Sequence, residues 1–136
     1  MKLMNRTFIA AMMTVFSACL AGCQSEAPLT ARGEDYDHPW LTVGSKDLRA
    51  STKVDDARRT RDEAGLLHVS VPVRNVTDKQ LYIDYRVTFF DQNEMELQTY
   101  RNTMTIPARG IRNATANSTS PKADSFRMEL TYPRVN

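Results

Sequence analysis

The sequence predicts an all-β protein, an immunoglobulin-like β-sandwich of about seven strands. In several segments apolar and polar residues alternate with a period of two, the pattern of strands with one buried and one solvated face. Short polar turns separate these segments. After residue 37, no apolar stripe with helical spacing extends beyond two turns. Two antiparallel sheets packed face to face bury strands of this kind.

Three segments show the alternation most clearly. Their alternating apolar residues are Leu67, Val69, Val71 and Val73; Leu81, Ile83, Tyr85, Val87 and Phe89; and Phe126, Met128, Leu130 and Tyr132. We expect the first two segments to form a hairpin, because only the short polar turn 75–80 separates them. Pro72 lies inside the first segment, and since proline has no amide hydrogen we expect it at a sheet edge or a bulge.

The remaining strand candidates are weaker, and they are 48–54, 95–99, 103–106 and 111–118. In the last of these, one register turns Ile111 inward and the other buries Ala114 and Ala116. We favour the second register, because the first would bury a polar row. Residues 55–65 are polar and charged. A helical turn is one interpretation of them, but we favour an exposed loop.

The first residues have the pattern of a bacterial lipoprotein signal peptide. Lys2 and Arg6 precede an apolar run from Phe8 to Leu20, and Leu20-Ala21-Gly22-Cys23 follows. This run of about 13 residues fits a signal sequence, whereas a membrane-spanning helix needs roughly 20. We therefore predict that residues 1–22 are removed and that the thiol of Cys23 carries the lipid.

The sequence allows two alternatives to this lipidation site. One is an ordinary secretory signal that is cleaved elsewhere, and the other is Cys19 as the lipid acceptor. We favour Cys23, because Cys19 lies inside the apolar run and would be discarded with it. Gln24 follows Cys23, where an Asp retains similar lipoproteins in the inner membrane. We therefore predict a lipid-anchored protein on the periplasmic face of the outer membrane.

The processed chain is expected to consist of a flexible linker, residues 23–37, and one domain, residues 38–136. Without Lys2 and Arg6 the 18 basic residues fall to 16, which equals the 16 acidic residues. A neutral chain gives no electrostatic reason to bind nucleic acid. Only Cys23 then remains, so no internal disulfide forms. We expect a monomer whose fold depends on its hydrophobic core.

Several phrases in the predicted domain resemble the YcfL-type family of small bacterial lipoproteins of unknown function. They are His38-Pro39-Trp40-Leu41, Val73-Arg74-Asn75-Val76-Thr77, Tyr85-Arg86-Val87-Thr88-Phe89-Phe90-Asp91, Met95, Ile106-Pro107-Ala108-Arg109-Gly110 and Arg127-Met128-Glu129-Leu130-Thr131-Tyr132. The resemblance implies an immunoglobulin-like sandwich and supplies no catalytic residues. The chain departs from the family at Glu94, where a Gly often ends the turn, so the turn geometry there is open.

Catalytic and metal-binding patterns are not found in the sequence. His38 and His68 are far apart and have no Cys partner, and the acidic residues flanking 58–61 lack the spacing of a calcium loop. Asp91, Glu94 and Glu96 crowd a single turn, whereas a hydrolase needs two carboxylates in opposed environments. We therefore predict a non-enzymatic protein with no cofactor and no metal.

The candidate interaction residues are Arg58, Arg59, Arg61 and Tyr82. The arginines would contact anionic lipid headgroups or an acidic partner, although neighbouring acids favour a simple solvated loop. Tyr82 is expected on the exposed strand face. Trp40 is either an exposed anchor or, as we favour, a buried plug. We predict a protein-binding accessory module of the cell envelope, with a small-ligand or glycan carrier or sensor as the alternative.

Overall fold

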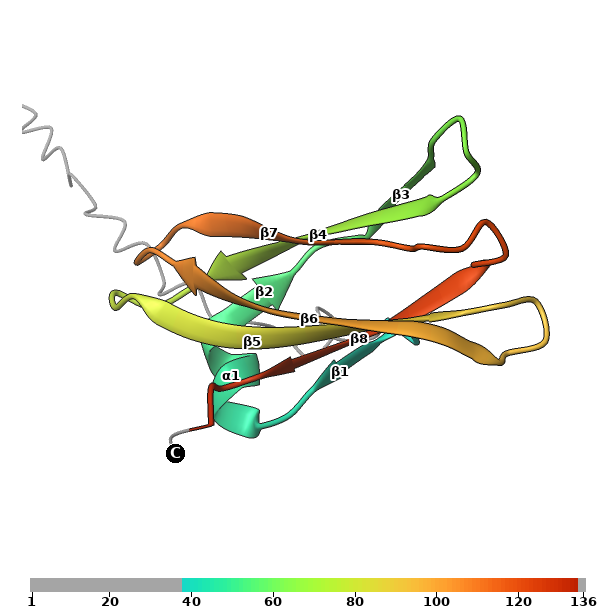
Figure 1. Ribbon diagram of the computed structural model, residues 1–136. Helices are drawn as coiled ribbons and strands as arrows, with labels where there is room; N and C mark the ends of the chain where they lie inside the picture. Colours follow the sequence, from blue (N-terminus) through green and yellow to red (C-terminus); the bar gives the residue numbers. More distant parts are fainter. Residues whose placement is uncertain (1–37, 135–136) are drawn as a thin grey trace, which may run out of the picture.

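The computed structural model describes residues 38–134 (Figure 1). The predicted leader, the predicted lipidation site Cys23 and the predicted linker 23–37 lie outside the described residues. The elements of the domain are β1 (Leu41–Val43), α1 (Lys46–Ser51), β2 (Thr52–Val54), β3 (Arg58–Arg61), β4 (Leu67–Asn75), β5 (Leu81–Phe90), β6 (Glu96–Ile106), β7 (Ile111–Asn117) and β8 (Ser125–Thr131).

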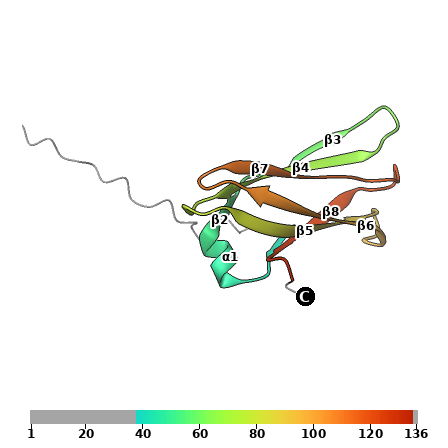
Figure 2. The ribbon, with the colours of Figure 1, turned by 60° about the vertical axis from the view of Figure 1, so that its left-hand side comes forward.

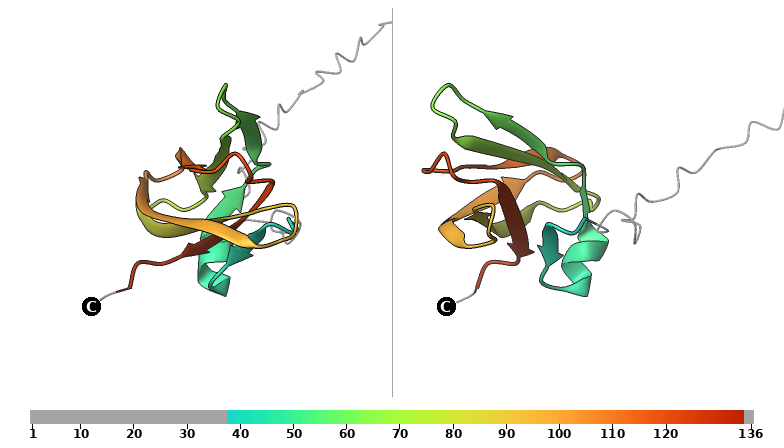
Figure 3. Two further views of the ribbon diagram at one scale, coloured as in Figure 1. Left: turned by 45° about the vertical axis from the view of Figure 1, so that its right-hand side comes forward. Right: turned by 90° about the vertical axis from the view of Figure 1, so that its right-hand side faces the viewer.

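The strands form two sheets that lie as separate layers (Figure 3). The first sheet has the order β1-β8-β5-β6, with β1 parallel to β8 and the other pairs antiparallel. In the second sheet β4 is central. It pairs with β2 and β3 on one edge and with β7 on the other. The predicted all-β sandwich is therefore confirmed, with eight strands rather than about seven.

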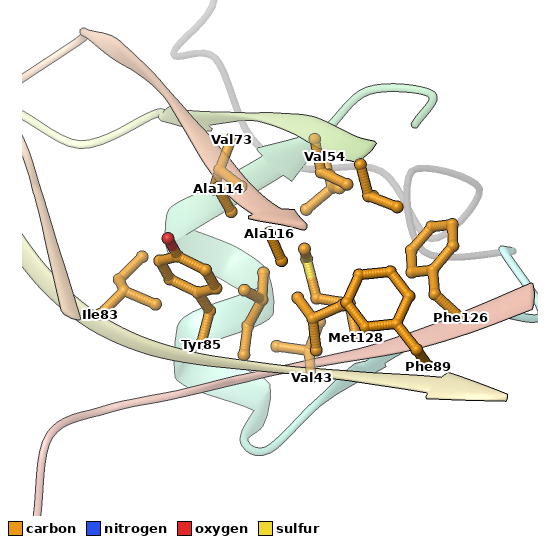
Figure 4. Packing of buried hydrophobic residues seen from close by; sticks show 14 of the residues in the cluster. Val43, Val54, Val73, Ile83, Tyr85, Phe89, Ala114, Ala116, Phe126 and Met128 are labelled. Atoms are coloured by element: carbon orange, nitrogen blue, oxygen red, sulfur yellow. The ribbon is translucent and has the colours of Figure 1, made fainter. Parts of the chain in front are cut away.

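The core lies between the two sheets (Figure 4). It is built by the inward residues of the strands that the sequence identified, and Ile83, Val87 and Phe89 have no exposed surface. Val71 and Val73 are equally buried on β4. Two residues depart from the predicted pattern: Leu81 is only partly buried, and Tyr132 follows β8 and is 40% exposed. Burial of these side chains is the main driving force for folding in a domain without a disulfide.

The predicted hairpin between 67–73 and 81–89 is wrong. β4 and β5 belong to different sheets, so the turn between them crosses from one layer to the other. Asn75 explains the crossing, because its side chain is fully buried and its Nδ2 donates to the carbonyls of Lys79 (2.6 Å), Ile106 (3.3 Å) and Pro107 (3.0 Å). Its Oδ1 accepts from the amide and the hydroxyl of Thr77. The buried amide thus joins this turn to the one between β6 and β7.

Residues 46–61 also differ from the prediction. The expected strand 48–54 is the short helix α1 followed by β2. Ser45 caps α1, since its Oγ accepts from the amide of Leu48 at 3.1 Å, and Leu48 is the buried residue of the helix. Figure 2 shows α1 at one end of the sandwich. The expected loop 55–65 contains β3, whose backbone pairs with β4 although all four of its side chains are exposed.

Pro72 lies in the central strand of its sheet rather than on an outer strand. It lies where the partner of β4 changes from β2 to β3, and its carbonyl accepts from the amide of Asp55 at 3.1 Å. The ring nitrogen faces the same side as this carbonyl, so the missing donor coincides with the interruption between β2 and β3. The expectation of a sheet edge or a bulge is therefore wrong: Pro72 lies in a central strand with regular pairing, and the break between β2 and β3 accommodates its missing donor.

Two further expectations concern β6 and β7. β7 buries Ala114 and Ala116 and leaves Ile111 42% exposed, so the favoured register is confirmed. The two weak segments 95–99 and 103–106 belong to one continuous strand, β6. Glu94, in the turn before β6, has a φ of 60°, a left-handed conformation in which a glycine would be unstrained.

Candidate functional site

The outer face of the β1-β8-β5-β6 sheet carries a shallow groove of about 550 Å³. We call it the arginine groove. Alternation turns the odd residues of β8 and the even residues of β5 outward, opposite to the core. The residues that line it are Thr42, Arg86, Thr88, Phe90, Glu96, Thr99, Arg101, Arg127, Met128 and Glu129.

The two carboxylates of the arginine groove already have partners. Arg86 and Glu129 form an ion pair between β5 and β8. Glu96 accepts a hydrogen bond from the Thr99 hydroxyl at 2.8 Å, and the Thr99 and Thr88 hydroxyls lie 3.1 Å apart on the floor. These contacts leave the cationic side chains as the groups with unused binding capacity.

Arg101 and Arg127 have no carboxylate partner among the described residues. Arg101 lies directly opposite Arg86 across the β5–β6 pair, and like charges in that position destabilise a sheet. Arg127 lies with its guanidinium 5.0 Å from the ring centroid of Phe90. An anionic group bound between these arginines would relieve the repulsion and fill the free guanidinium donors.

The predicted interaction residues on β3 do not form one patch. Arg59 and Arg61 pair with the buried residues Val69 and Leu67, so they point toward the opposite sheet. Arg59 lies 5.0 Å from the ring centroid of Phe126. Arg58 pairs with Ser70 and is on the other face.

Arg61 also forms hydrogen bonds to other parts of the domain. It donates to the carbonyl oxygens of Ala123 (2.6 Å) and Gly65 (2.9 Å). Two of the three arginines thus cover the edge of the core, and their alkyl stems and guanidiniums contribute to packing.

The two predicted aromatic positions lie in different environments. Tyr82 is 55% exposed on the same outer face as the arginine groove, and its hydroxyl accepts from Gln80 Nε2 at 2.6 Å. Trp40 is half-buried. Its ring lies 5.2 Å from that of Phe126 and stacks on His38 at 4.8 Å, an arrangement that agrees with the expected plug.

The residues considered for catalysis have structural partners. Asp91 Oδ1 accepts from the amides of Asn93 (2.8 Å) and Met95 (2.9 Å), so it organises its turn. His68 has Asp62 Oδ2 2.9 Å from Nε2 and Asn117 Oδ1 2.7 Å from Nδ1. The hydrogen bond with Asp62 raises the pKa of His68, and the bond with Asn117 adds to this. Both ring nitrogens therefore serve as donors in the protonated form.

Residues 38–134 were compared with the features of metal sites and of membrane-spanning helices. That part of the chain contains no group of three His, Cys, Asp or Glu side chains placed to hold a metal ion. It also contains no helix with the length and apolar character to cross a membrane.

The arginine groove was missed in the sequence, although its residues were visible. Arg86 lies on the polar face of a correctly identified strand, and Arg127 on that of another. What the sequence does not give is that β5 lies between β8 and β6, which places Arg86 beside Arg101. The alternation of charged residues on the two polar faces was the available signal.

Comparisons with known proteins place the chain in a family without an assigned function. The profile of the family described as "Protein of unknown function (DUF1425)" matches residues 40–132. No curated protein matches the chain. Since the profile covers more than half of the chain, the chain belongs to the DUF1425 family.

Two crystal structures share the fold. One is that of Campylobacter jejuni cj0090, with a TM-score of 0.59 and 18% identity over 71% of this chain and 100% of that chain. The other is a DUF1425 family member from Shewanella sp. pv-4, with a TM-score of 0.55 and 17% identity over 62% of this chain and 81% of that chain. At these identities the likeness concerns the fold alone.

Proposed function

We propose that this DUF1425 protein is a lipid-anchored, non-enzymatic module of the cell envelope that binds an acidic protein partner through the arginine groove. The lipid is carried by Cys23, on the periplasmic face of the outer membrane. The observation that carries the proposal is the opposition of Arg86 and Arg101, together with the unpaired Arg127. Anchoring confines the domain to a thin layer and so raises its effective concentration for envelope partners.

The anchoring part of the proposal depends on the sequence. The Leu20-Ala21-Gly22-Cys23 motif follows an apolar run of signal-peptide length, and the resemblance to YcfL-type lipoproteins supports the same interpretation. Each buried methylene of an acyl chain contributes roughly 0.8 kcal/mol, so several chains hold a protein on a membrane.

The binding part depends on the chemistry of the arginine groove. A guanidinium presents a planar set of donors that fits a carboxylate with two hydrogen bonds. The hydroxyls of Thr88 and Thr99 lie on the floor beside these donors. The groove is open and shallow, which suits a side chain or segment of a protein better than an enclosed small molecule.

The alternative, a carrier of a small ligand inside the sandwich, receives less support. The space between the sheets contains fully buried side chains, including Phe89, Ile83 and Leu130. A ligand there would have to displace close-packed core residues.

Photo-crosslinking in the native host tests the binding site. A photoreactive phenylalanine analogue replaces Thr88 in the arginine groove or, as a control, Ser70 on the outer face of the other sheet. We expect a specific partner adduct from position 88 alone, with the crosslinked residues of the partner in an acidic segment. Equal adducts from both positions would contradict the proposal.

Charge reversal provides the matched comparison. We expect Arg101→Glu with Arg127→Glu to reduce the adduct by at least about tenfold, because reversal turns attraction into repulsion. Arg58→Glu with Arg74→Glu makes the same charge change on the other sheet and should leave the yield unchanged. The lipid is tested separately, since palmitate should label the wild type and Cys19→Ser but not Cys23→Ser.

A further inference from the structure

The outer edge of β6 is a long backbone edge with little protection. β6 pairs only with β5 among the described residues, and its 11 residues include one arginine, one glutamate and no proline. Natural edge strands are usually short or carry charges, prolines or bulges that prevent pairing with another chain. β3 follows that rule with three arginines in four residues. β6 has a register shift only at its first residues, between Glu96 and Gln98, and its pairing with β5 is regular from Gln98 to Ile106. Figure 1 shows β6 along the side of the sandwich.

The backbone groups on this edge belong to identifiable residues. The amide of Thr103 donates to the side chain of Asn102 at 2.8 Å, so it points away from β5. Backbone groups alternate in direction along a strand. Thr99, Arg101 and Thr105 therefore also present their amides and carbonyls at the free edge.

The same residues send their side chains to the outer face. Thr99 and Arg101 line the arginine groove, and the Thr103 hydroxyl donates to Asp84 Oδ1 at 2.7 Å on that face. In a strand added to this edge, the Cβ atoms of outward-facing residues would lie about 4.5–5.5 Å from the Cβ atoms of the opposed residues, such as Arg101. The free backbone and the unneutralised positive charge thus coincide in one element.

We infer that an extended acidic segment of a partner protein binds by adding a strand to the free edge of β6. Its backbone pairs with Thr99, Arg101 and Thr105, and with Thr103 once that amide exchanges the Asn102 side chain for the partner's carbonyl. An acidic side chain of the segment neutralises Arg101. Main-chain hydrogen bonds supply affinity in this binding mode and side chains supply specificity. The inference rests on the proposed function and names the binding mode of the same site.

Charge favours an acidic partner over a second copy of this chain. The arginine groove is lined by three arginines and two glutamates, so a second copy would bring a further excess of positive charge to the same edge. β7, the outer strand of the other sheet, is shorter, and none of its residues lines the arginine groove. An acidic strand on β6 is the occupant that removes the repulsion.

Hydrogen exchange of the full chain, purified in detergent, tests the binding mode. The probe is a capped seven-residue peptide of alternating Glu and Val, and its matched control replaces each Glu with Lys. We expect the acidic peptide to slow exchange at residues 99–105 at least about tenfold and to leave 58–61 unchanged. The lysine peptide should have no effect. If the acidic peptide leaves exchange at 99–105 unchanged, the inference is overturned.

A proline variant separates strand addition from simple charge attraction. Thr103→Pro removes an edge amide that β5 does not use, so the fold should persist, whereas peptide affinity should fall about tenfold or more. Thr103→Ala keeps the amide and should retain affinity. Binding that is lost in Arg101→Glu with Arg127→Glu but kept in Thr103→Pro overturns strand addition and leaves the proposed function standing. Dimerisation of the chain, with slowed exchange at 99–105 without peptide, overturns the acidic occupant in favour of a second copy.

Discussion

The two ends of the sandwich are held together by different chemistry. At one end, which we call the amide end, the turns 76–80 and 107–110 are joined by the fully buried side chain of Asn75. At the other, the charged end, the turns 62–66, 91–95 and 118–124 are fixed by Arg61, His68 and Asp91 near the surface. Figure 1 shows these two sets of turns at opposite ends.

This difference predicts how each end responds to its surroundings. A buried neutral amide whose hydrogen bonds are all formed is insensitive to salt and pH. Its removal leaves several backbone groups without a hydrogen-bond partner. Exposed charged contacts contribute less, and salt or protonation changes them. We therefore expect mutations at the amide end to cost more, and the charged end to carry the pH dependence.

Removal of the buried amide should have the largest effect. We expect Asn75→Ala to lower the free energy of unfolding by about 2–4 kcal/mol, because the carbonyls of Lys79 and Pro107 and the amide of Thr77 lose their partner. Urea denaturation measures the change. Asn113→Ala, an exposed position on β7, is the control and should stay within about 0.5 kcal/mol. Equal losses would erase the contrast between the ends.

A smaller loss is expected at the charged end. Arg61→Ala removes the hydrogen bonds to the carbonyls of Ala123 and Gly65, and we expect it to lower the free energy of unfolding by about 1 kcal/mol. Arg58→Ala removes the same side chain from the outer face of the strand and should be neutral within about 0.5 kcal/mol. The same denaturation assay distinguishes the two. If Arg58→Ala costs as much, the assignment of opposite faces is wrong.

Each end contains one non-glycine residue with a left-handed backbone, and these two residues sharpen the comparison. Glu94 has a φ of 60° and Arg109 a φ of 57°. Glu94→Gly relieves this strain and should raise the free energy of unfolding by about 0.5–1 kcal/mol. Arg109→Gly should gain less, because it also removes the ion pair with Asp78, 2.8 Å away. Thermal melts of both variants test the order.

The smallest effect is a pH dependence at the charged end. The hydrogen bond with Asp62 raises the pKa of His68 above its usual 6.5. The contribution of this contact to the stability of the folded state is therefore fully present below pH 6.5, and it is lost as the pH rises through the raised pKa. The pKa of Asp62 is lowered from 3.8 by the same bond, so its contribution is present above pH 3.8 and fades below it.

The melting temperature from pH 5 to 8 measures this dependence. We expect the wild type to lose its advantage over His68→Gln as pH rises, and NMR titration to place the pKa of His68 above 6.5. A constant difference across that range would contradict the role of the ion pair.

Which face of each strand is buried could be predicted from the sequence. In 67–75 and 83–89 every second residue is buried as expected, because the two-residue period of an extended chain fixes the faces. The preferred register of 111–117 followed from the same rule. Periodicity is local information, so it survives without knowledge of the fold.

Which strands pair, and therefore where the arginine groove lies, was decided by the tertiary structure. A short polar turn reads as a hairpin, but the buried Asn75 directs the chain to the other sheet. The sequence predicts a loop for residues 58–61 because all four side chains are polar. In the structure their backbone pairs with the edge of β4 and forms a strand. Arg86 and Arg101 become neighbours only because β5 and β6 pair in that register. These outcomes depend on contacts between residues distant in sequence, which a local pattern does not contain.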